Sequence, residues 1–502
     1  MSFMESLENK ASRTRTLNGA AAYSTSGEAC LDFFAVAGGM RYRPLREQLR
    51  LFDRAYIETP DLAMKLLFHI RDIRGGMGER KLFRNLLRHV AFTWPESARK
   101  NAAYISRYGR WDDLLCLLGT PAQEEVVRLI REQLERDMQA VDRLEKGEKG
   151  VTVSLLPKWM PSGNTSSRRT CKQAARLMQA LDMTAKDYRR MLSRLRAHSG
   201  LTECRLTARH PERIRYQMVP AGAMLKYRNA FHRQDGKRFS AYLADVAENR
   251  CTMHADTLFP HEILRPFFGE GGWGATIRKP KGAETLEMLW KSMSLETGNA
   301  NALSVVDTSG STYCASEGVP VPALISQAMG LYCAERCKGL FHNWIITFES
   351  NPHLVKIHGK TLEDKLRYLG TLPWGFSTDL EAVFRLILEA AVEADAKQEE
   401  MPSVLYIFSD MEFNCAVRNP DKTVYENARE LFEYYGYQMP AVVFHNVNSW
   451  QMQLPVRANT RGAALTSGAG VSALKEHFDG NVTPMSHMLR VLNGSRYADI
   501  RA

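Results

Sequence analysis

The stretch "LSVVDTSGSTYC", residues 303 to 314, is an apolar run that ends in one carboxylate, Asp307, followed by a cluster of hydroxyl side chains. Continuous apolar runs are typical of strands that are buried on both faces of a parallel sheet. Ser309 and Ser311 follow Asp307 at alternate positions, so their side chains point the same way on the next loop. We therefore expect a polar, functional loop at the carboxyl end of a buried strand.

Four more apolar runs bounded by turn residues follow in the sequence. They are "NWIITFE" (343–349), "SVLYIFSD" (403–410), "PAVVFH" (440–445) and "GAALTSG" (462–468). Segments that predict helices lie between the runs, at 319–337, 362–369, 378–395 and 423–436. This alternation predicts an α/β doubly wound sheet over residues 296–502, with its ligand site beyond the carboxyl ends of the strands.

Residues 1–295 predict helices instead. The segments "PDLAMKLLFHIRDIR" (60–74) and "ERKLFRNLLRHVAFTW" (79–94) repeat apolar residues every three or four positions, as amphipathic helices do. Gly75 and Gly76 separate them, where a helix C-cap favours a positive φ. Further helices are expected at about 170–198 and 219–246. We predict an α-helical solenoid of loosely repeating hairpins.

The positive charge of the chain is concentrated in one region. Formal net charge is +11, but residues 301–502 hold 17 Lys and Arg against 22 Asp and Glu, which leaves +16 on residues 1–300. Residues 151–250 hold 20 Lys and Arg against 7 Asp and Glu, a surplus of +13. Such a surplus attracts polyanions, of which nucleic acid is the commonest. The alternative is a solvated helical surface that is simply basic.

Basic residues on loops and helix starts of this region are the candidate phosphate contacts. They are Lys158, Arg168, Arg169, Lys172, Arg189, Arg190, Arg194, Arg196, Lys226, Arg228, Arg233, Lys237 and Arg238. Hydroxyls of the loop "PSGNTSSRRT" (161–170) can also reach phosphate oxygens. Tyr227 and His232 can stack on unpaired bases or, alternatively, pack in the core.

Three predicted loops bring oxygen ligands to the same edge of the sheet. Asp307, Ser309 and Ser311 form the first set, Thr378 of "GFSTDLEAVF" the second, and Asp410 of "IFSDMEF" the third. Hydroxyl and carboxylate oxygens suit a hard divalent cation such as Mg²⁺. The alternative is simple helix capping, because Asp, Ser and Thr are also good N-caps.

These residues resemble the metal-ion-dependent adhesion site of von Willebrand factor A domains, an Asp-x-Ser-x-Ser motif with a Thr and an Asp on later loops. The resemblance implies that Ser309, Ser311 and Thr378 contact the cation through their hydroxyls. It implies that Asp307 and Asp410 act directly or through water. Mostly neutral ligands would leave the cation electrophilic, so that a partner's carboxylate can take an open position.

A basic helical half followed by such a domain resembles the Ro autoantigen family, in which a TROVE module of HEAT-like helices forms a ring closed by the A domain. The N-terminal segments that carry this resemblance are "FHIRDIRGGMGERKLFRNLL" (68–87), "RYGRWDDLL" (107–115), "LPKWMPSG" (156–163), "DYRRMLSRLR" (187–196) and "YQMVPAGAMLKYRNAFHRQDGKRFSAYL" (216–243). The resemblance implies a TROVE-like domain at 1–295 and an A domain at 296–502. It also implies binding of small noncoding RNA and of the single-stranded ends of misfolded RNA.

The same resemblance implies a noncatalytic scaffold for RNA quality control, with an exonuclease or another protein as partner at the metal site. Two other classes stay open. One is a metal-dependent protein-interaction adaptor, for instance for an ATPase, and the other is a metal nuclease that uses Asp307, Asp410 and Glu412. The predicted ligands are mostly neutral hydroxyls, whereas phosphoryl chemistry usually recruits carboxylates, which favours a protein that is not an enzyme.

Composition agrees with a globular protein of two or more domains, since 44% of the 502 residues are hydrophobic and 25% are charged. The sequence has neither a long apolar run nor the apolar segment of a signal peptide, so we expect a cytoplasmic protein with no membrane partner. We expect no DNA partner.

Nine cysteines without regular spacing fit reduced thiols. Cys333 and Cys337 could share a zinc ion, but buried thiols are the default interpretation.

Overall fold

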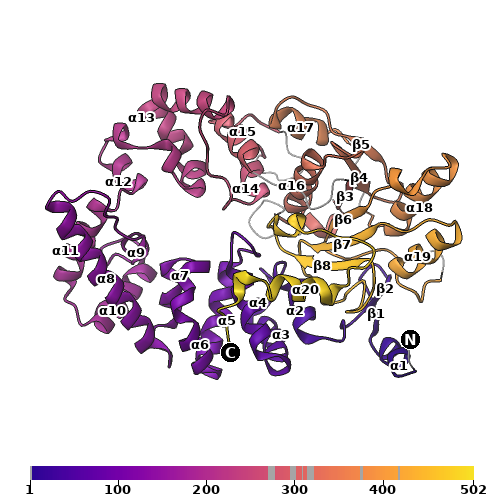
Figure 1. The fold of residues 1–502 in the computed structure, drawn as a ribbon, viewed down its shortest axis with the longest axis horizontal. Helices are drawn as coiled ribbons and strands as arrows, with labels where there is room; N and C mark the ends of the chain where they lie inside the picture. Colours follow the sequence, from indigo (N-terminus) through magenta and orange to yellow (C-terminus); the bar gives the residue numbers. More distant parts are fainter. Residues whose placement is uncertain are drawn as a thin grey trace.

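The computed structural model describes residues 3–268, 277–293, 301–307, 309–313, 321–372, 377–415 and 419–502. An arc of helices is followed by a mixed sheet flanked by helices (Figure 1). At one end of the arc, helix α2 (Ala29–Ala37) packs on strand β8 (Ala463–Ser467). At the other end, α14 (Pro260–Leu264) packs on α16 (Val321–Arg336). The sheet therefore joins the two ends of the arc into one circuit of packed elements.

The predicted helical character of the N-terminal part is confirmed. After α2 the arc contains α3 (Leu45–Glu58), α4 (Pro60–Arg71), α5 (Arg80–Thr93), α6 (Pro95–Asn101), α7 (Ile105–Tyr108), α8 (Gln123–Glu145), α9 (Leu156–Trp159), α10 (Arg168–Leu181), α11 (Ala185–His198), α12 (Thr202–Thr207), α13 (Ala221–Ala247), α14 and α15 (Ala283–Ser292). Helix α5 illustrates the pattern, because Leu82, Leu86 and Val90 lie one turn apart and are buried. Its basic residues stay on the opposite, partly exposed side.

The Gly pair after α4 has a different role from the predicted one. The positive φ, +70°, belongs to Gly78, and the expectation of a positive φ at Gly75 and Gly76 is wrong. Gly76 is required by close approach, since a Cβ atom there would lie 2.0 Å from the carbonyl oxygen of His69. The chain turns back onto α4 so tightly at Gly76 that a side chain does not fit.

The C-terminal part is a six-stranded mixed sheet with the order β5-β4-β3-β6-β7-β8. Its strands are β3 (Ala302–Asp307), β4 (Trp344–Phe348), β5 (Leu354–Lys356), β6 (Val404–Ser409), β7 (Ala441–Asn446) and β8. All neighbours pair in parallel except β5, which is antiparallel to β4 at the edge. The five predicted strands are confirmed. Strand β5 was not predicted because its three residues, Leu-Val-Lys, are half-exposed and form no apolar run.

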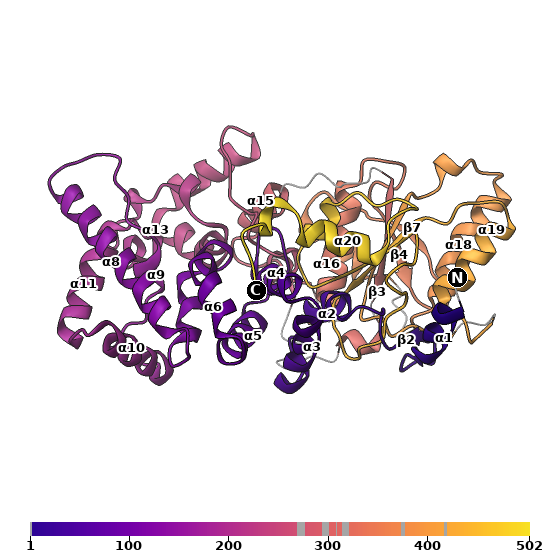
Figure 2. The same cartoon turned by 60° about the horizontal axis from the view of Figure 1, so that its bottom comes forward.

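Helices cover both faces of this sheet, as the doubly wound prediction requires (Figure 2). Besides α16 they are α17 (Leu362–Leu369), α18 (Leu380–Glu393), α19 (Val424–Tyr434) and α20 (Pro484–Leu492). Alternate residues of β3 point to opposite cores, with Leu303 and Val305 on the side of α18 and α19, and Val306 on the side of α16. The former core continues without a break into the helices of the arc.

The beginning of the chain is built into the sheet. Strands β1 (Arg13–Arg15) and β2 (Ala21–Tyr23) form a hairpin that bridges to residues 414, 423 and 454. Helix α2 then runs along β8, where the Ser467 hydroxyl donates to the carbonyl of Phe34 at 3.0 Å and accepts from the N–H of Gly38 at 3.0 Å. Residues 13–40 therefore contact the C-terminal part, with the hairpin on its loops and α2, the first helix of the arc, on β8.

Candidate functional site

The candidate cation site starts at Asp307, the last residue of β3. Asp307 Oδ1 accepts the N–H of Ser309 at 2.8 Å, and Oδ2 accepts the hydroxyl of Ser409 at the end of the neighbouring strand β6. The N–H of Asp307 donates to Ser326 Oγ of α16 at 3.0 Å. The carboxylate is fully buried, and the ends of two strands fix its orientation.

The structure brings four of the five predicted ligands into one hydrogen-bonded group. Ser309 Oγ and Ser311 Oγ lie 3.1 Å apart, and the Ser311 hydroxyl bonds the carboxyl group of Asp410. The backbone N–H of Asp410 in turn bonds the Asp307 carboxylate. Asp307, Ser309, Ser311 and Asp410 thus form a closed set at the carboxyl ends of β3 and β6, the edge where doubly wound sheets bind ligands.

The surroundings disfavour the charged forms of the two carboxyl groups of this set. Burial and the adjacent negative charge of Asp307 raise the pKa of Asp410 to about 8. Burial also raises the pKa of Asp307, although hydrogen bonds from Ser309 and Ser409 oppose this. Asp410 Oδ2 is buried with no hydrogen-bond partner, and no Lys or Arg of the described residues pairs with either carboxylate. A divalent cation would supply the positive charge that these two carboxyl groups lack. The residues therefore fit a hard cation.

Thr378 lies beside the group, and its hydroxyl bonds residues outside it. Its hydroxyl donates to the carbonyl oxygen of Glu412 at 2.5 Å, and Asn18 Nδ2 donates to Thr378 Oγ1 at 3.2 Å. The N-cap of α18 is the neighbouring Asp379, which accepts the N–H of Ala382 at 2.9 Å. The capping alternative therefore applies to Asp379. The Thr378 hydroxyl does not cap α18.

Glu412 connects the site to the start of the chain, a role that the sequence did not predict. It is 1% exposed, Oε2 accepts the N–H of Leu17 at 2.8 Å, and Oε1 accepts Gln453 Nε2 at 2.7 Å. Because both oxygens are engaged, Glu412 holds loops together here, in contrast to the ligand role that the nuclease alternative gives it. Its contacts are to residues far away in sequence, so no local pattern reveals them.

A site rich in His, Cys and carboxylates is absent from the described residues, where no group of three or more such side chains could hold a metal ion. The Asp307 group differs in kind, because it offers two carboxylates and several hydroxyls. Cys333 and Cys337 are buried thiols, and neither forms a disulfide within the described residues. Burial raises the pKa of the Cys333 thiol to about 12, which disfavours the thiolate that zinc requires.

Five of the predicted phosphate contacts are already engaged within the protein. Lys158 pairs with Glu203 at 2.9 Å, and Arg194 pairs with Asp142 and Glu145 at 2.6 and 2.5 Å. Arg196 donates to the carbonyls of 157 and 160, Arg228 to those of 225 and 281, and Arg238 to those of 211 and 214 and to Asp235. These side chains brace helices and loops, so we no longer expect them to be the main phosphate contacts.

The other eight are exposed and have no carboxylate partner among the described residues. They are Arg168, Arg169, Lys172, Arg189, Arg190, Lys226, Arg233 and Lys237. The two residues predicted to stack on bases already contact other side chains. His232 Nε2 lies 3.1 Å from Glu284, and its ring packs edge-on to Phe239. Lys226 lies over the Tyr227 ring. The packing interpretation is the better one for His232.

Arg168, Arg169 and Lys172 line a groove of about 580 Å³ between α10 and α5. Helix α10 begins at Arg168, because Ser167 caps it by accepting the N–H of Thr170 at 3.3 Å. Residues 168, 172 and 176 follow at one-turn intervals, so their side chains share one face of the helix. Three arginines of the groove were not predicted: Arg84, Arg88 and Arg176. The one-turn spacing of 168, 172 and 176 was the available signal for Arg176.

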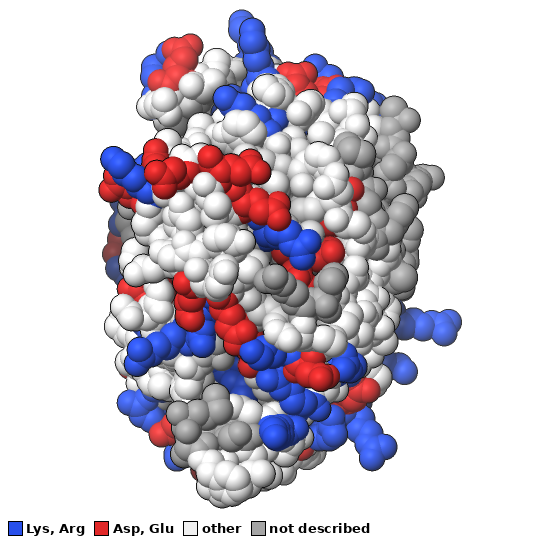
Figure 3. Space-filling model, turned by 90° about the vertical axis from the view of Figure 1, so that its right-hand side faces the viewer, with Lys and Arg blue, Asp and Glu red and all other residues white. Residues whose placement is uncertain are grey.

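A second basic groove, about 770 Å³, lies beside α13. Its lining includes the predicted Lys226 and Arg228 together with Arg265, Arg278, Lys279 and Lys281, which the sequence analysis did not select. The opposite end of the molecule is different: the face at the sheet end carries acidic and basic residues side by side, with wide uncharged areas (Figure 3). Both basic grooves therefore lie on the helical arc.

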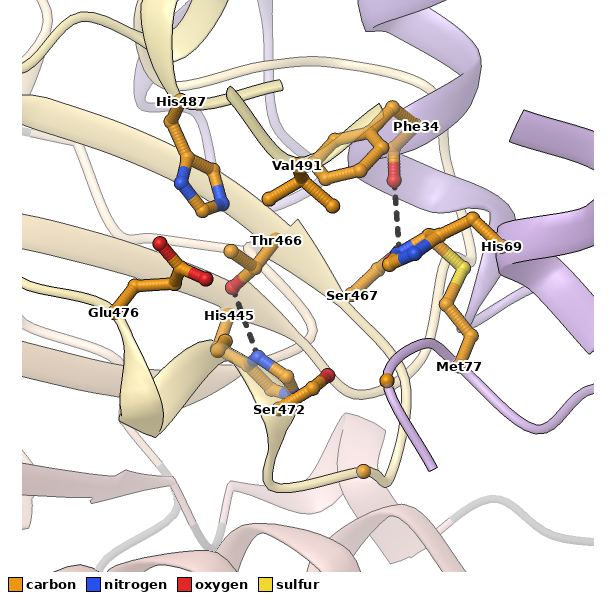
Figure 4. A pocket seen from close by; sticks show the side chains of 13 residues that line it. Phe34, His69, Met77, His445, Thr466, Ser467, Ser472, Glu476, His487 and Val491 are labelled. Carbon is orange, nitrogen blue, oxygen red and sulfur yellow. Dashed lines mark hydrogen bonds between the residues drawn. The ribbon is translucent and has the colours of Figure 1, made fainter. Parts of the chain in front are cut away.

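Three histidines meet in a small cavity where α2, α4, β7, β8 and α20 converge (Figure 4). His445 contacts Thr466 Oγ1 and the carbonyl of Gly468, each at 2.9 Å, and His69 Nδ1 lies 3.1 Å from the Tyr497 hydroxyl. His487 Nδ1 is buried without a partner in the described part of the chain. The cavity measures about 40 Å³, enough for a water molecule, and lies at the closure of the circuit.

The fold and the site define a two-part protein, a basic helical arc closed by an α/β sheet with an oxygen-rich loop cluster. The chain belongs to the family described as domain of unknown function (DUF2828), which matches residues 16–127 and 122–296, more than half of the chain. A second domain of unknown function (DUF7788) matches residues 301–491. Within the described residues, no helix has both the length and the apolar character needed to cross a membrane.

A viral protein and a solved structure are similar to this chain. The chain is 29% identical over 513 residues to the uncharacterized protein L728 of Acanthamoeba polyphaga mimivirus, a match that covers 95% of this chain and 86% of that protein. It is also similar to the crystal structure of the RO (RSR) protein of Deinococcus radiodurans, with 15% sequence identity and a TM-score of 0.45. That match covers 94% of this chain and 100% of the other.

Proposed function

We propose that this protein is a noncatalytic, Ro-like scaffold that binds RNA on its helical arc, contacting small noncoding RNA and the single-stranded ends of misfolded RNA. The observation that carries the proposal is the α10 groove, where Arg168, Arg169, Lys172 and Arg176 are exposed and have no carboxylate partner among the described residues, while Asp112 of the groove pairs with Arg84. Charges left unpaired on one face are available to phosphates, which bind through counterion release. The Ro-like segments between residues 68 and 243 support the same assignment.

The test is RNA binding by fluorescence anisotropy, with a labelled hairpin that carries a single-stranded 3′ end. The triple variant Arg168→Ala/Arg169→Ala/Lys172→Ala should lose at least tenfold in affinity, since each phosphate contact contributes about 1 kcal/mol. The matched control is Arg99→Ala/Arg107→Ala/Arg128→Ala, which removes the same charge from arginines that pair with carboxylates. Equal losses in both variants would mean that net charge, and not this groove, drives binding.

The Asp307 group supports a second function, cation-dependent binding of a protein partner of the von Willebrand factor A type. The observation in its favour is the buried, unpartnered Asp410 Oδ2 beside a second buried carboxylate. Asp307, Ser309, Ser311, Thr378 and Asp410 would hold the cation, and their oxygens suit the hard ion Mg²⁺. A bound Mg²⁺ supplies a positive centre for a partner's carboxylate. An exonuclease or an ATPase subunit is a partner of this kind.

Calorimetric titration with MgCl₂ tests this second function. Wild type should bind Mg²⁺, and Asp307→Asn should not. An RNA cleavage assay with MgCl₂ separates the scaffold from the nuclease alternative, because cleavage that disappears in Asp307→Asn would require an enzyme. We expect the RNA to remain intact.

A further inference from the structure

The candidate cation site is closed over by the start of the chain. Asp307, Thr378 and Asp410 are only 0%, 1% and 2% exposed, whereas Asn18, which contacts Thr378, is itself exposed. On the other side, Trp450 Nε1 donates to the carbonyl of Ser311 at 3.3 Å. A partner's carboxylate has to reach these oxygens from solvent, so at least one of the covering residues must move.

The Asn18 cover is attached to the loop that carries Asp410. Asn18 Nδ2 donates to the carbonyl of Glu412 at 2.7 Å, and the neighbouring Leu17 N–H donates to the Glu412 carboxylate at 2.8 Å. Thr16 Oγ1 donates to the carbonyl of Phe413 at 2.6 Å. The turn between β1 and β2, residues 16–20, and the loop after β6 are therefore one hydrogen-bonded unit.

The contact between Asn18 and Thr378 opposes cation binding at the same oxygen. Thr378 has a single proton, which it gives to the carbonyl of Glu412 at 2.5 Å or to Asn414 Oδ1 at 3.1 Å, so the N–H of Asn18 bonds a lone pair of Thr378 Oγ1. The N–H of Asn18 brings partial positive charge to Thr378 Oγ1. A cation on that oxygen would be repelled by this N–H and would compete with it for the same electron density.

We propose that Asn18 is a positioning residue of the candidate cation site and that the β1–β2 turn is its movable cover. Asn18 holds the Thr378 hydroxyl while no cation is bound, and a cation loosens this hold and exposes the site to a partner's carboxylate. Linkage makes the effect reciprocal, because whatever weakens the contact between Asn18 and Thr378 strengthens cation binding by the same factor. This inference rests on the cation-dependent function proposed above.

Calorimetric titration of the full chain with MgCl₂ tests the proposal. Asn18→Ala should bind Mg²⁺ about fivefold more tightly than wild type, the effect of losing one competing hydrogen bond. Asn18→Ser, which is too short to reach Thr378, should do the same and serves if the alanine variant folds poorly. The control is Arg15→Ala, which breaks contacts of the same hairpin to Gly19 and Asp421 and leaves Thr378 alone.

Hydrogen exchange gives a readout that does not depend on affinity. MgCl₂ should speed amide exchange of residues 16–20 in wild type and leave it unchanged in Asp307→Asn. Mg²⁺ binding that neither Asn18 variant strengthens, or that Arg15→Ala strengthens equally, overturns the role of Asn18 and leaves the cation site standing. Absence of Mg²⁺ binding in wild type and both Asn18 variants defeats the cation site itself.

Discussion

Asp72 at the end of α4 accepts two hydrogen bonds from the guanidinium of Arg496, which lies 424 positions later in the chain. The Asp72 side chain is 1% exposed, and the Tyr497 hydroxyl donates to it as well, at 3.1 Å. This cluster attaches the last residues of the chain to the arc. The Tyr497 hydroxyl also lies 3.4 Å from the carbonyl of Gly75, so the cluster fixes the turn after α4 to the C-terminal segment.

Breaking this pair should destabilise the protein strongly. Asp72→Asn weakens two charge-assisted hydrogen bonds from Arg496, whose side chain is 42% exposed, and we expect a loss of about 2 kcal/mol in the free energy of unfolding. Thermal unfolding measured by circular dichroism checks this. The control is Arg107→Ala, since the pair of Arg107 with Asp499 is about half-exposed on both sides and should contribute less than about 1 kcal/mol. Equal effects would contradict the buried character of the Asp72 pair.

The contact between α2 and the loop after β8 should tolerate no side chain at Gly38. A Cβ atom there would lie 2.4 Å from the backbone nitrogen of Gly468, and neither backbone can yield easily. Gly38→Ala should therefore cost about 2 kcal/mol or more of stability. Gly222→Ala in α13 is the control, because its Cβ would meet nothing within 4 Å. A similar melting temperature for both variants would show that α2 can shift away from β8.

Acid should lower the stability of the protein where the arc packs on the sheet, because three buried histidines lie there. Burial lowers the pKa of His69 and His445 to about 4 and that of His487 to about 3. The unfolded chain takes up these protons at about pH 6.5, so the stability that each neutral histidine provides is present above that pH and is lost as pH falls. The loss is about 1.4 kcal/mol per pH unit for each histidine.

His487→Phe isolates this effect, because it keeps a ring beside Phe34 and Phe478 and removes the titrating group. The difference in melting temperature between neutral and mildly acidic buffer should shrink in this variant. His477→Ala, on the exposed loop before α20, should leave that difference as in wild type. If both variants retain the full pH dependence, His487 does not contribute to it.

The salt dependence of RNA binding should identify the groove more directly than affinity alone. Each lost contact to single-stranded RNA lowers the slope of log K against log salt by about 0.7, so the triple variant of Arg168, Arg169 and Lys172 should show a slope smaller by about 2. Anisotropy titrations over a range of KCl concentrations measure it. Arg194→Ala, which loses an internal ion pair, should keep nearly the wild-type slope.

Removal of one carboxylate from the Asp307 group should raise the melting temperature relative to wild type without a cation and lower it relative to wild type with one. In EDTA at a pH above 8, where Asp410 is ionised, Asp410→Asn should melt at a higher temperature than wild type, because it relieves the repulsion between two buried carboxylates. With MgCl₂ the wild type should gain stability by binding the ion, and the variant should gain much less. If Asp410→Asn is less stable in both buffers, Asp410 has a structural role other than the one proposed.

The sequence predicted the elements well where each carries its own pattern. The β3, β4, β6, β7 and β8 strands are continuous apolar runs, and the arc helices repeat apolar residues every three or four positions. The sequence also predicted which polar loop residues lie near one another, because parallel strands bring their carboxyl ends together. This placed Asp307, Ser309, Ser311 and Asp410 in one region before their contacts were known.

Long-range pairing decided what the sequence could not show. Whether a basic side chain is free depends on partners such as Glu203 for Lys158 or Glu145 for Arg194, which lie about 45 positions or more away. The docking of residues 12–40 on the sheet had no signal either, since β1 and β2 are only three residues long. Glu412 and Asn18 became visible only when these distant segments were seen together.

The docking of α2 on β8 has a consequence for how the chain is made. All nine residues of α2 are buried, yet the Ser467 hydroxyl that binds its Phe34 carbonyl comes 433 positions later. A ribosome that adds about 5–20 residues per second needs roughly 20 to 90 seconds to cover that interval. During this time the apolar segment "ACLDFFAVA" has no sheet to cover it, so nascent chains should depend on chaperones until synthesis is nearly finished.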